Sequence, residues 1–140
     1  MGSWSGATEF KFCGGYKIMR QNEEKVVRLV ERFQSAVSGD GFEGFFHADA
    51  GDDAQATLNA LLVLKATGAA ALLRRAMWVF DGAAPPSEQS LRREALLRIG
   101  ASGRSVLRRL DAAFRRHDGD LTRLLTRYSR SLDGRHHVAS

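Results

Sequence analysis

Apolar residues that recur at steps of three and four are the feature that most constrains how this chain can fold. In the clearest stretch, Leu121, Leu124, Leu125, Tyr128 and Leu132 share one face of a helix. Leu and Ala dominate the apolar residues, and the β-branched types typical of strands are scarce. We therefore predict an all-α fold, a compact bundle of about six helices in antiparallel hairpins with no significant sheet.

Glycine, proline and acidic residues separate the periodic stretches. Pro85-Pro86 is the clearest break, and Gly68 is predicted to end a helix because glycine readily adopts the left-handed conformation. Asp118-Gly119-Asp120 is predicted to form a tight turn between two helices. The predicted N-caps are Asn22, Asp52 or Asp53, Ser87 and Asp120. The predicted helices cover residues 22–37, 53–67, 69–80, 87–99, 104–117 and 120–132.

The length of 140 residues suits a single domain. Residues 1–21 are rich in glycine, serine and aromatic residues without a helical period, and we predict a flexible N-terminal tail or extension there. Within it, Thr8–Phe12 alternates as a short strand would, but no partner strand follows. Residues 22–132 are predicted to form one helical domain, followed by a polar C-terminal tail at 133–140.

Several classes of protein are disfavoured by composition. The single cysteine, Cys13, cannot form an internal disulfide. No apolar run approaches the ~20 residues of a membrane-spanning helix, and the N-terminus lacks the apolar core of a secretion signal. We therefore expect a cytoplasmic protein that does not associate with a membrane.

The formal net charge of +5 is distributed unevenly along the chain. Residues 1–70 contain seven Lys or Arg and nine Asp or Glu, whereas residues 71–140 contain fourteen Arg, no Lys and seven acids. A basic half of this kind can attract polyanions or acidic proteins. A GC-rich genome would equally favour arginine over lysine.

The stretch Gly39–Asp53 differs from the rest of the chain. It contains three phenylalanines, four glycines and five acids, and no Lys or Arg. Phe42, Phe45 and Phe46 have the spacing of one face of a short helix, so we predict that they anchor the stretch in the core.

Catalysis and metal binding find little support in the motifs. His47, Asp49, Asp52 and Asp53 are residue types that can bind a divalent ion. Their spacing does not follow a calcium loop, and two of the acids are better explained as helix caps. Cys13 has no histidine near it in sequence, and no nucleophile elbow, phosphate loop or dinucleotide-binding turn occurs. We predict no enzyme activity, no cofactor and no metal.

Several motifs follow one another in an order that resembles a known family. They are Gly39-Asp40-Gly41-Phe42, Phe45-Phe46, Gly51-Asp52, Gly68-Ala69, Phe80, Leu110-Asp111-Ala112-Ala113-Phe114 and the acidic turn before Leu121. From about Val26 to Leu132 the chain is thus similar to small bacterial helical domains of unknown function, typified by a DNA-mimic protein that binds a transcription regulator. The resemblance implies a helical module that binds a protein.

The charge of this chain departs from that of a DNA mimic, which must present an anionic surface. Only the region from Asp40 to Asp53 has the necessary sign. We therefore predict a non-catalytic protein-binding module whose acidic surface meets a DNA-binding regulator or a toxin with a basic groove. The predicted partner-binding residues are Asp40, Glu43, Asp49, Asp52 and Asp53.

The alternative prediction is direct nucleic-acid binding by the arginine-rich second half. Its arginines lie off the apolar stripes of successive helices, and aligned faces would form a phosphate-binding strip. An ordinary solvated helix surface would show the same pattern. The candidate residues are Arg92, Arg93, Arg104, Arg108, Arg109, Arg115 and Arg116.

Overall fold

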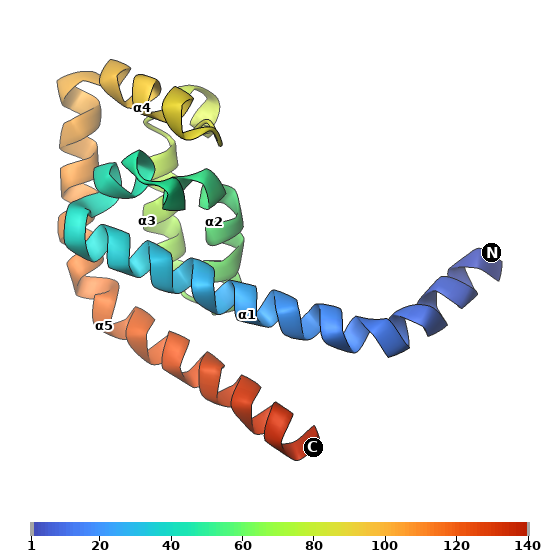
Figure 1. Ribbon diagram of the computed structural model, residues 1–140. Helices are drawn as coiled ribbons and strands as arrows, with labels where there is room; N and C mark the ends of the chain where they lie inside the picture. Colours follow the sequence, from blue (N-terminus) through green and yellow to red (C-terminus); the bar gives the residue numbers. More distant parts are fainter. Residues whose placement is uncertain (1, 140) are drawn as a thin grey trace.

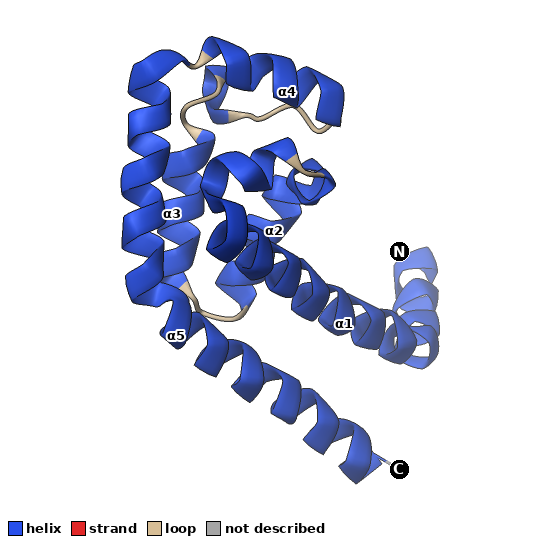
Figure 2. Cartoon of the chain, turned by 60° about the vertical axis from the view of Figure 1, so that its left-hand side comes forward, coloured by secondary structure: helices blue, strands red, loops and turns tan. Residues whose placement is uncertain are grey.

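The computed structural model describes the backbone of residues 2–139 and the side chains of residues 22–132. All regular secondary structure in this part of the chain is helical, which confirms the predicted all-α class (Figure 2). The α-helices are α1 (Gly2–His47), α2 (Ala54–Val63), α3 (Thr67–Met77), α4 (Gln89–Arg98) and α5 (Gly100–Ala139), with short 3-10 helices η1 (Asp49–Asp53) and η2 (Asp81–Ala83).

The helices pack around one core, with α2 and α3 forming an antiparallel hairpin (Figure 1). The long helices α1 and α5 pack against each other, while α5 also contacts α3 and α1 contacts α2. α4 lies across one end of the bundle, where it contacts α1 and η1 before the chain enters α5.

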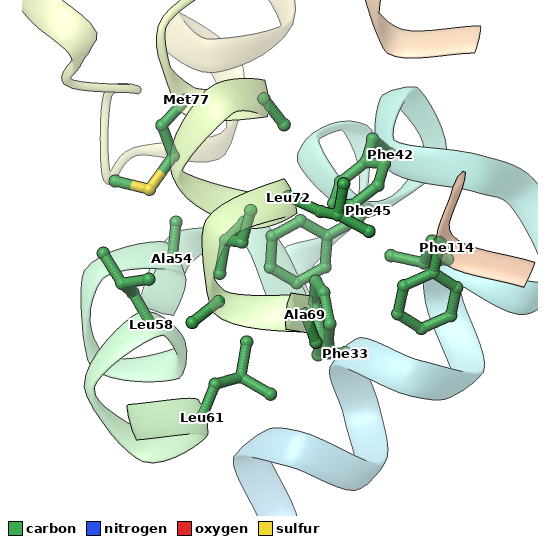
Figure 3. Packing of buried hydrophobic residues seen from close by; sticks show 14 of the residues in the cluster. Phe33, Phe42, Phe45, Ala54, Leu58, Leu61, Ala69, Leu72, Met77 and Phe114 are labelled. Carbon is green, nitrogen blue, oxygen red and sulfur yellow. The ribbon is translucent and has the colours of Figure 1, made fainter. Parts of the chain in front are cut away.

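Phenylalanines from α1 and α5 form the centre of the core (Figure 3). Phe33 packs edge-on against Phe45 and Phe114, with ring centroids 5.3 and 5.5 Å apart, a geometry that favours aromatic pairs. Phe42, Phe45 and Phe46 are all fully buried, so their predicted role as core anchors is confirmed. Leucine and alanine side chains of α2 and α3 complete the core on the other side.

α1 is interrupted at Gly41, where φ is 76° and ψ is −178°. The first helix therefore continues past its predicted end at residue 37 and breaks at Gly41, within the glycine-containing stretch that follows. Helical geometry resumes at Phe42, whose N–H donates to Asp111 Oδ1 over 2.8 Å instead of to a carbonyl one turn back. A Cβ at Gly41 would lie 2.5 Å from Asp111 Oδ2, so both its φ and this close approach require glycine.

The predicted role of Gly68 as the residue that ends a helix is wrong. The chain leaves α2 through Lys65, which takes the left-handed conformation with φ of 62°. The N–H of Lys65 donates to the carbonyl of Leu62 and that of Ala66 to the carbonyl of Leu61, the two bonds of a Schellman motif. Gly68 lies instead in the first turn of α3, where a Cβ would come within 2.8 Å of the His117 ring.

The tight turn predicted at Asp118-Gly119-Asp120 is also wrong, because α5 continues through it. The Asp118 carboxylate accepts hydrogen bonds from Gln34 Nε2 at 2.8 Å and Ser38 Oγ at 3.3 Å, both on α1. These long-range bonds fix Asp118 on the inner side of a continuous helix. The two predicted C-terminal helices are therefore one.

Three predicted N-caps, Asn22, Ser87 and Asp120, differ from the structure, in which Asp120 lies inside α5, whereas the N-cap predicted at Asp52 or Asp53 is confirmed in position at Asp53. Asn22 lies inside α1, and Glu88 rather than Ser87 occupies the N-cap position of α4. Asp53 is at the N-cap of α2, but its side chain makes no capping hydrogen bond. These helix ends are positioned by packing and by long-range contacts.

The chain before residue 22 and after residue 132 has helical backbone out to residues 2 and 139. The run Thr8–Phe12 is thus helical, not extended. The side chains of residues 1–21, Cys13 included, and of 133–140 lie outside the described residues, so the proposed domain limits stay a prediction. In the part of the chain searched, no helix has the length and apolar character needed to cross a membrane.

Candidate functional site

The five acids predicted to bind a partner, called here the acidic segment, lie on the second half of α1 and on η1. Arg32 Nη2 is 3.4 Å from Asp49 Oδ1, and Arg32 Nη1 is 4.0 Å from Asp53 Oδ2. Arg104 Nε is 3.7 Å from Glu43 Oε2. The positive charge of the same chain therefore offsets much of the acidic segment, and only Asp40 among its members makes no ion pair with another described residue.

The fourth of these acids, Asp52, pairs with Arg92, the largest fully buried side chain in the described part of the chain. Arg92 is 0% exposed, so its predicted place on an exposed polyanion-binding strip is wrong. Its Nη2 donates to Asp52 Oδ1 over 2.8 Å and to the carbonyl of Ala48 over 2.7 Å. Nε donates to the carbonyl of Phe46, and Nη1 to the carbonyls of Pro86 and Ser87.

The position of Arg92 follows from how α1 ends. The last carbonyls of a helix have no partner within it and carry partial negative charge, which cations stabilise. α4 supplies the missing donors, since Arg93 Nε and Gln89 Nε2 both donate to the carbonyl of His47 at 3.0 and 3.1 Å. Gly51 allows Arg92 to fit, because a Cβ there would lie 2.7 Å from Arg92 Nε. The Gly51-Asp52 motif therefore has a structural role: Gly51 makes room for Arg92, Asp52 pairs with it, and α4 is held against the end of α1.

Four of the predicted polyanion-binding arginines, Arg108, Arg109, Arg115 and Arg116, are exposed on α5. Successive residues of an α-helix are rotated by about 100° around its axis. By this rule, Arg109, Arg116 and three further exposed arginines of α5 lie within a sector of about 60°, on one side of the helix. We call this set the arginine face, and its stripe is about 30 Å long at 1.5 Å per residue. The arginine face consists of Arg109, Arg116, Arg123, Arg127 and Arg130.

Sequence reasoning missed the second half of the arginine face because the predicted turn assigned Arg123, Arg127 and Arg130 to a separate helix. The signal was present as a seven-residue spacing from Arg109 through Arg116 and Arg123 to Arg130. One acid, Asp120, lies within the stripe and pairs with Arg123.

The other acids in the described part of α5, Asp111 and Asp118, face inward, toward α1. Asp118 binds Gln34 and Ser38, and Asp111 accepts the Phe42 N–H. Burial raises the pKa of the Asp111 carboxyl above its ordinary value, although the Phe42 N–H and the nearby Arg115 act in the opposite direction. Inward acids and outward arginines make the exposed side of α5 strongly positive.

The residues considered for metal binding do not form a site in the structure. Asp49, Asp52 and Asp53 are engaged by Arg32 and Arg92 as described above. Among the side chains of residues 22–132, no group of three or more His, Cys, Asp or Glu is placed to hold a metal ion.

Comparison with known proteins gives one family match. A family model described as DMP19-like protein matches residues 21–132, which includes the second part of α1 and continues to Leu132 in α5. No curated protein matches the chain. No solved structure matches it either.

Proposed function

Since the chain belongs to the family of DMP19-like proteins, we propose that it is a non-catalytic helical module that acts by binding another protein. We further propose that the arginine face carries the charged part of the interface and that the partner is an acidic protein. The resemblance noted in the sequence supports binding to a protein. The positive charges of α5 support a partner with a negatively charged surface.

The observation that carries this proposal is the difference in how the two charged surfaces are paired. Asp49 and Asp53 share Arg32, and Glu43 lies against Arg104, so a basic partner would have to compete with these contacts. Within residues 22–132, Arg109 and Arg116 make no ion pair. An acidic partner could therefore bind Arg109 and Arg116 without first breaking an ion pair within the described part of the chain.

The sequence-based alternative, a DNA-binding regulator or a toxin with a basic groove, would use the acidic segment instead. The two possibilities are distinguished by matched charge reversals. We would compare Arg109→Glu/Arg116→Glu/Arg127→Glu with Asp49→Lys/Asp53→Lys, using the full chain as bait and quantifying captured proteins by mass spectrometry.

We expect the triple arginine variant to lose the proteins captured by the wild type, while the acidic-segment variant retains them. Both variants should keep the wild-type circular dichroism spectrum, since the substituted side chains are exposed or, at Asp53, half-exposed. If instead the acidic-segment variant alone loses capture, the partner is basic and the arginine face is not the interface.

Nucleic-acid binding is the second candidate, and the length and regularity of the arginine face favour it. A stripe of about 30 Å could follow several phosphates of one strand at ~3.4 Å per phosphate. Electrophoretic shifts of random duplex and single-stranded probes at low and moderate salt would test it. Binding should weaken as salt rises and disappear in the triple arginine variant, and no shift at low salt would exclude it.

A further inference from the structure

A second surface, which shares no residue with the arginine face, exposes an unusual amount of apolar area. Trp78, directly after α3, has 67% of its surface exposed, and Val106 on the first part of α5 has 37%. Large exposed apolar side chains that cluster are informative because they mark interaction sites on soluble proteins. Tryptophan is also among the residues most enriched at the energetic centres of protein interfaces.

The surroundings of Trp78 form a groove. One hollow of about 450 Å³ is lined by Trp78, Val79, Ile99 and Val106, among others. A second, of about 310 Å³, is lined by Val79, Ile99 and Leu91, so the two hollows adjoin along shared residues. We call the combined surface the Trp78 groove. It lies where the end of α3, the helix α4 and the start of α5 meet (Figure 1).

The charges that line the Trp78 groove are mainly positive. Arg75 lines the first hollow, which has no acidic residue in its lining, and Arg98 and Asp81 line the second. No described acidic side chain forms an ion pair with Arg75 or Arg98. An occupant that supplies carboxylates beside an apolar stripe would therefore complement the groove in both polarity and charge.

We propose that the Trp78 groove binds an acidic amphipathic helix of a partner protein. Apolar side chains of that helix would cover Trp78, Ile99 and Val106, and its flanking carboxylates would lie against Arg75 and Arg98. Helices commonly bind in this way, through anchors at positions i, i+3, i+4 and i+7 placed in a hydrophobic groove.

The same observations argue against a second copy of this chain as the occupant. A two-fold dimer places the same patch on both subunits, so grooves paired in this way would bring Arg75 and Arg98 toward like charges. The acids of the acidic segment are largely engaged by Arg32, Arg92 and Arg104 within the chain. An external acidic helix fits better.

The test uses a phage-displayed library of amphipathic helices with a constant apolar stripe and with Glu, Lys or Gln at the other positions. The full chain is the bait, and the Trp78→Ser variant is the counter-selection. We expect enriched peptides to contain more Glu than Lys. In a Trp4→Phe background the enriched peptides should shift the emission of Trp78 to shorter wavelength, because the indole becomes buried.

Substitutions then locate the binding surface. Trp78→Ser should weaken binding of an enriched peptide at least about tenfold, as expected for a central interface residue. Arg75→Glu/Arg98→Glu should shift selection toward Lys-containing peptides. Val63→Ser and Arg74→Glu are matched controls, exposed but outside both hollows, and should change neither affinity nor charge preference. Unchanged circular dichroism and melting temperature would show that the variants remain folded.

Three results would overturn the proposal. They are the absence of peptides enriched over the Trp78→Ser bait, equal enrichment of Glu and Lys, and concentration-dependent dimerisation in sedimentation experiments that Trp78→Ser abolishes. The last result would assign the groove to a second copy. Since the library tests the groove alone, its failure would leave the proposed role of the arginine face intact, and the converse also holds.

Discussion

Arg92 and the arginines of α5 are the same residue type in similar sequence contexts, yet they have opposite environments. Arg92-Arg93 and Arg115-Arg116 are both arginine pairs, and each directly follows an apolar residue of a predicted helix, Leu91 or Phe114. Arg92 is completely buried, whereas Arg115 and Arg116 are exposed. The difference arises from what each helix meets, since α4 abuts the open carbonyls at the end of α1 and α5 turns its arginines toward solvent.

A buried guanidinium is tolerated only when its donors are satisfied, because an unpaired charge in the interior is costly. The planar, multi-donor shape of arginine lets Arg92 serve several backbone carbonyls and Asp52 at once. Among the described residues, no buried side-chain nitrogen or oxygen lacks a hydrogen-bond partner. We infer that Arg92 contributes to stability and that the arginine face is available for binding.

The sharpest test of this comparison is Arg92→Met, for which we expect the largest effect. The variant removes the guanidinium donors from the carbonyls of Phe46, Ala48, Pro86 and Ser87 and leaves Asp52 without its cation, which should lower the free energy of unfolding by about 3–5 kcal/mol. Urea unfolding followed by circular dichroism would measure it. Arg93→Met is the matched control and should cost less than about 1 kcal/mol, since Arg93 is exposed. Equal losses in the two variants would contradict the distinction.

Two acidic residues, the partly buried Asp111 and the exposed Asp49, allow the same comparison of stability effects as the arginines. Asp111→Ala removes the acceptor of the Phe42 N–H where helical geometry restarts, so we expect a loss of about 1–2 kcal/mol. Asp111→Asn keeps an acceptor oxygen and should cost less. Asp49→Ala removes a side chain that is 77% exposed and should change the unfolding free energy by less than about 0.5 kcal/mol. If Asp111→Asn lowers the unfolding free energy as much as Asp111→Ala does, the hydrogen bond from Phe42 is not the source of the stabilisation.

The pH dependence of the unfolding free energy distinguishes the effect of the Asp111 charge from the effect of its hydrogen bond to Phe42. Burial raises the pKa of Asp111 in the folded state, so the folded protein binds this proton more tightly than the unfolded chain. The stabilising contribution of that proton is complete below the unfolded pKa and is lost as pH rises through the folded pKa. Relative to the wild type, Asp111→Asn should therefore become more favourable as pH rises from the acid range. If the difference in unfolding free energy between the wild type and Asp111→Asn does not change with pH, the Asp111 carboxyl has an ordinary pKa.

Local patterns in the sequence were sufficient to predict the all-α class, the buried phenylalanines and the break near Gly41. Each depends on periodicity or on the conformational freedom of one residue. The left-handed Lys65 could not be predicted, because the bonds that hold it depend on where α2 stops. The burial of Arg92 and the continuity of α5 at Asp118 depend on partners 40 or more residues away, so no window of sequence contains them. The exposure of Trp78 likewise depends on packing between helices.

The arginine face should show the smallest effect on stability. Arg116→Ala and Arg127→Ala remove exposed side chains that form no ion pair with another described residue, so each should change the unfolding free energy by less than about 0.5 kcal/mol. For Arg127→Ala the change could be favourable, because Arg123 lies one turn earlier and like charges at this spacing repel by a few tenths of a kcal/mol, roughly 0.2–0.5. The same urea titrations used for Arg92→Met would measure both variants. A loss above about 1 kcal/mol would mean that these arginines also stabilise the fold. Exposure would then no longer distinguish arginines available for partner binding from arginines that stabilise the structure.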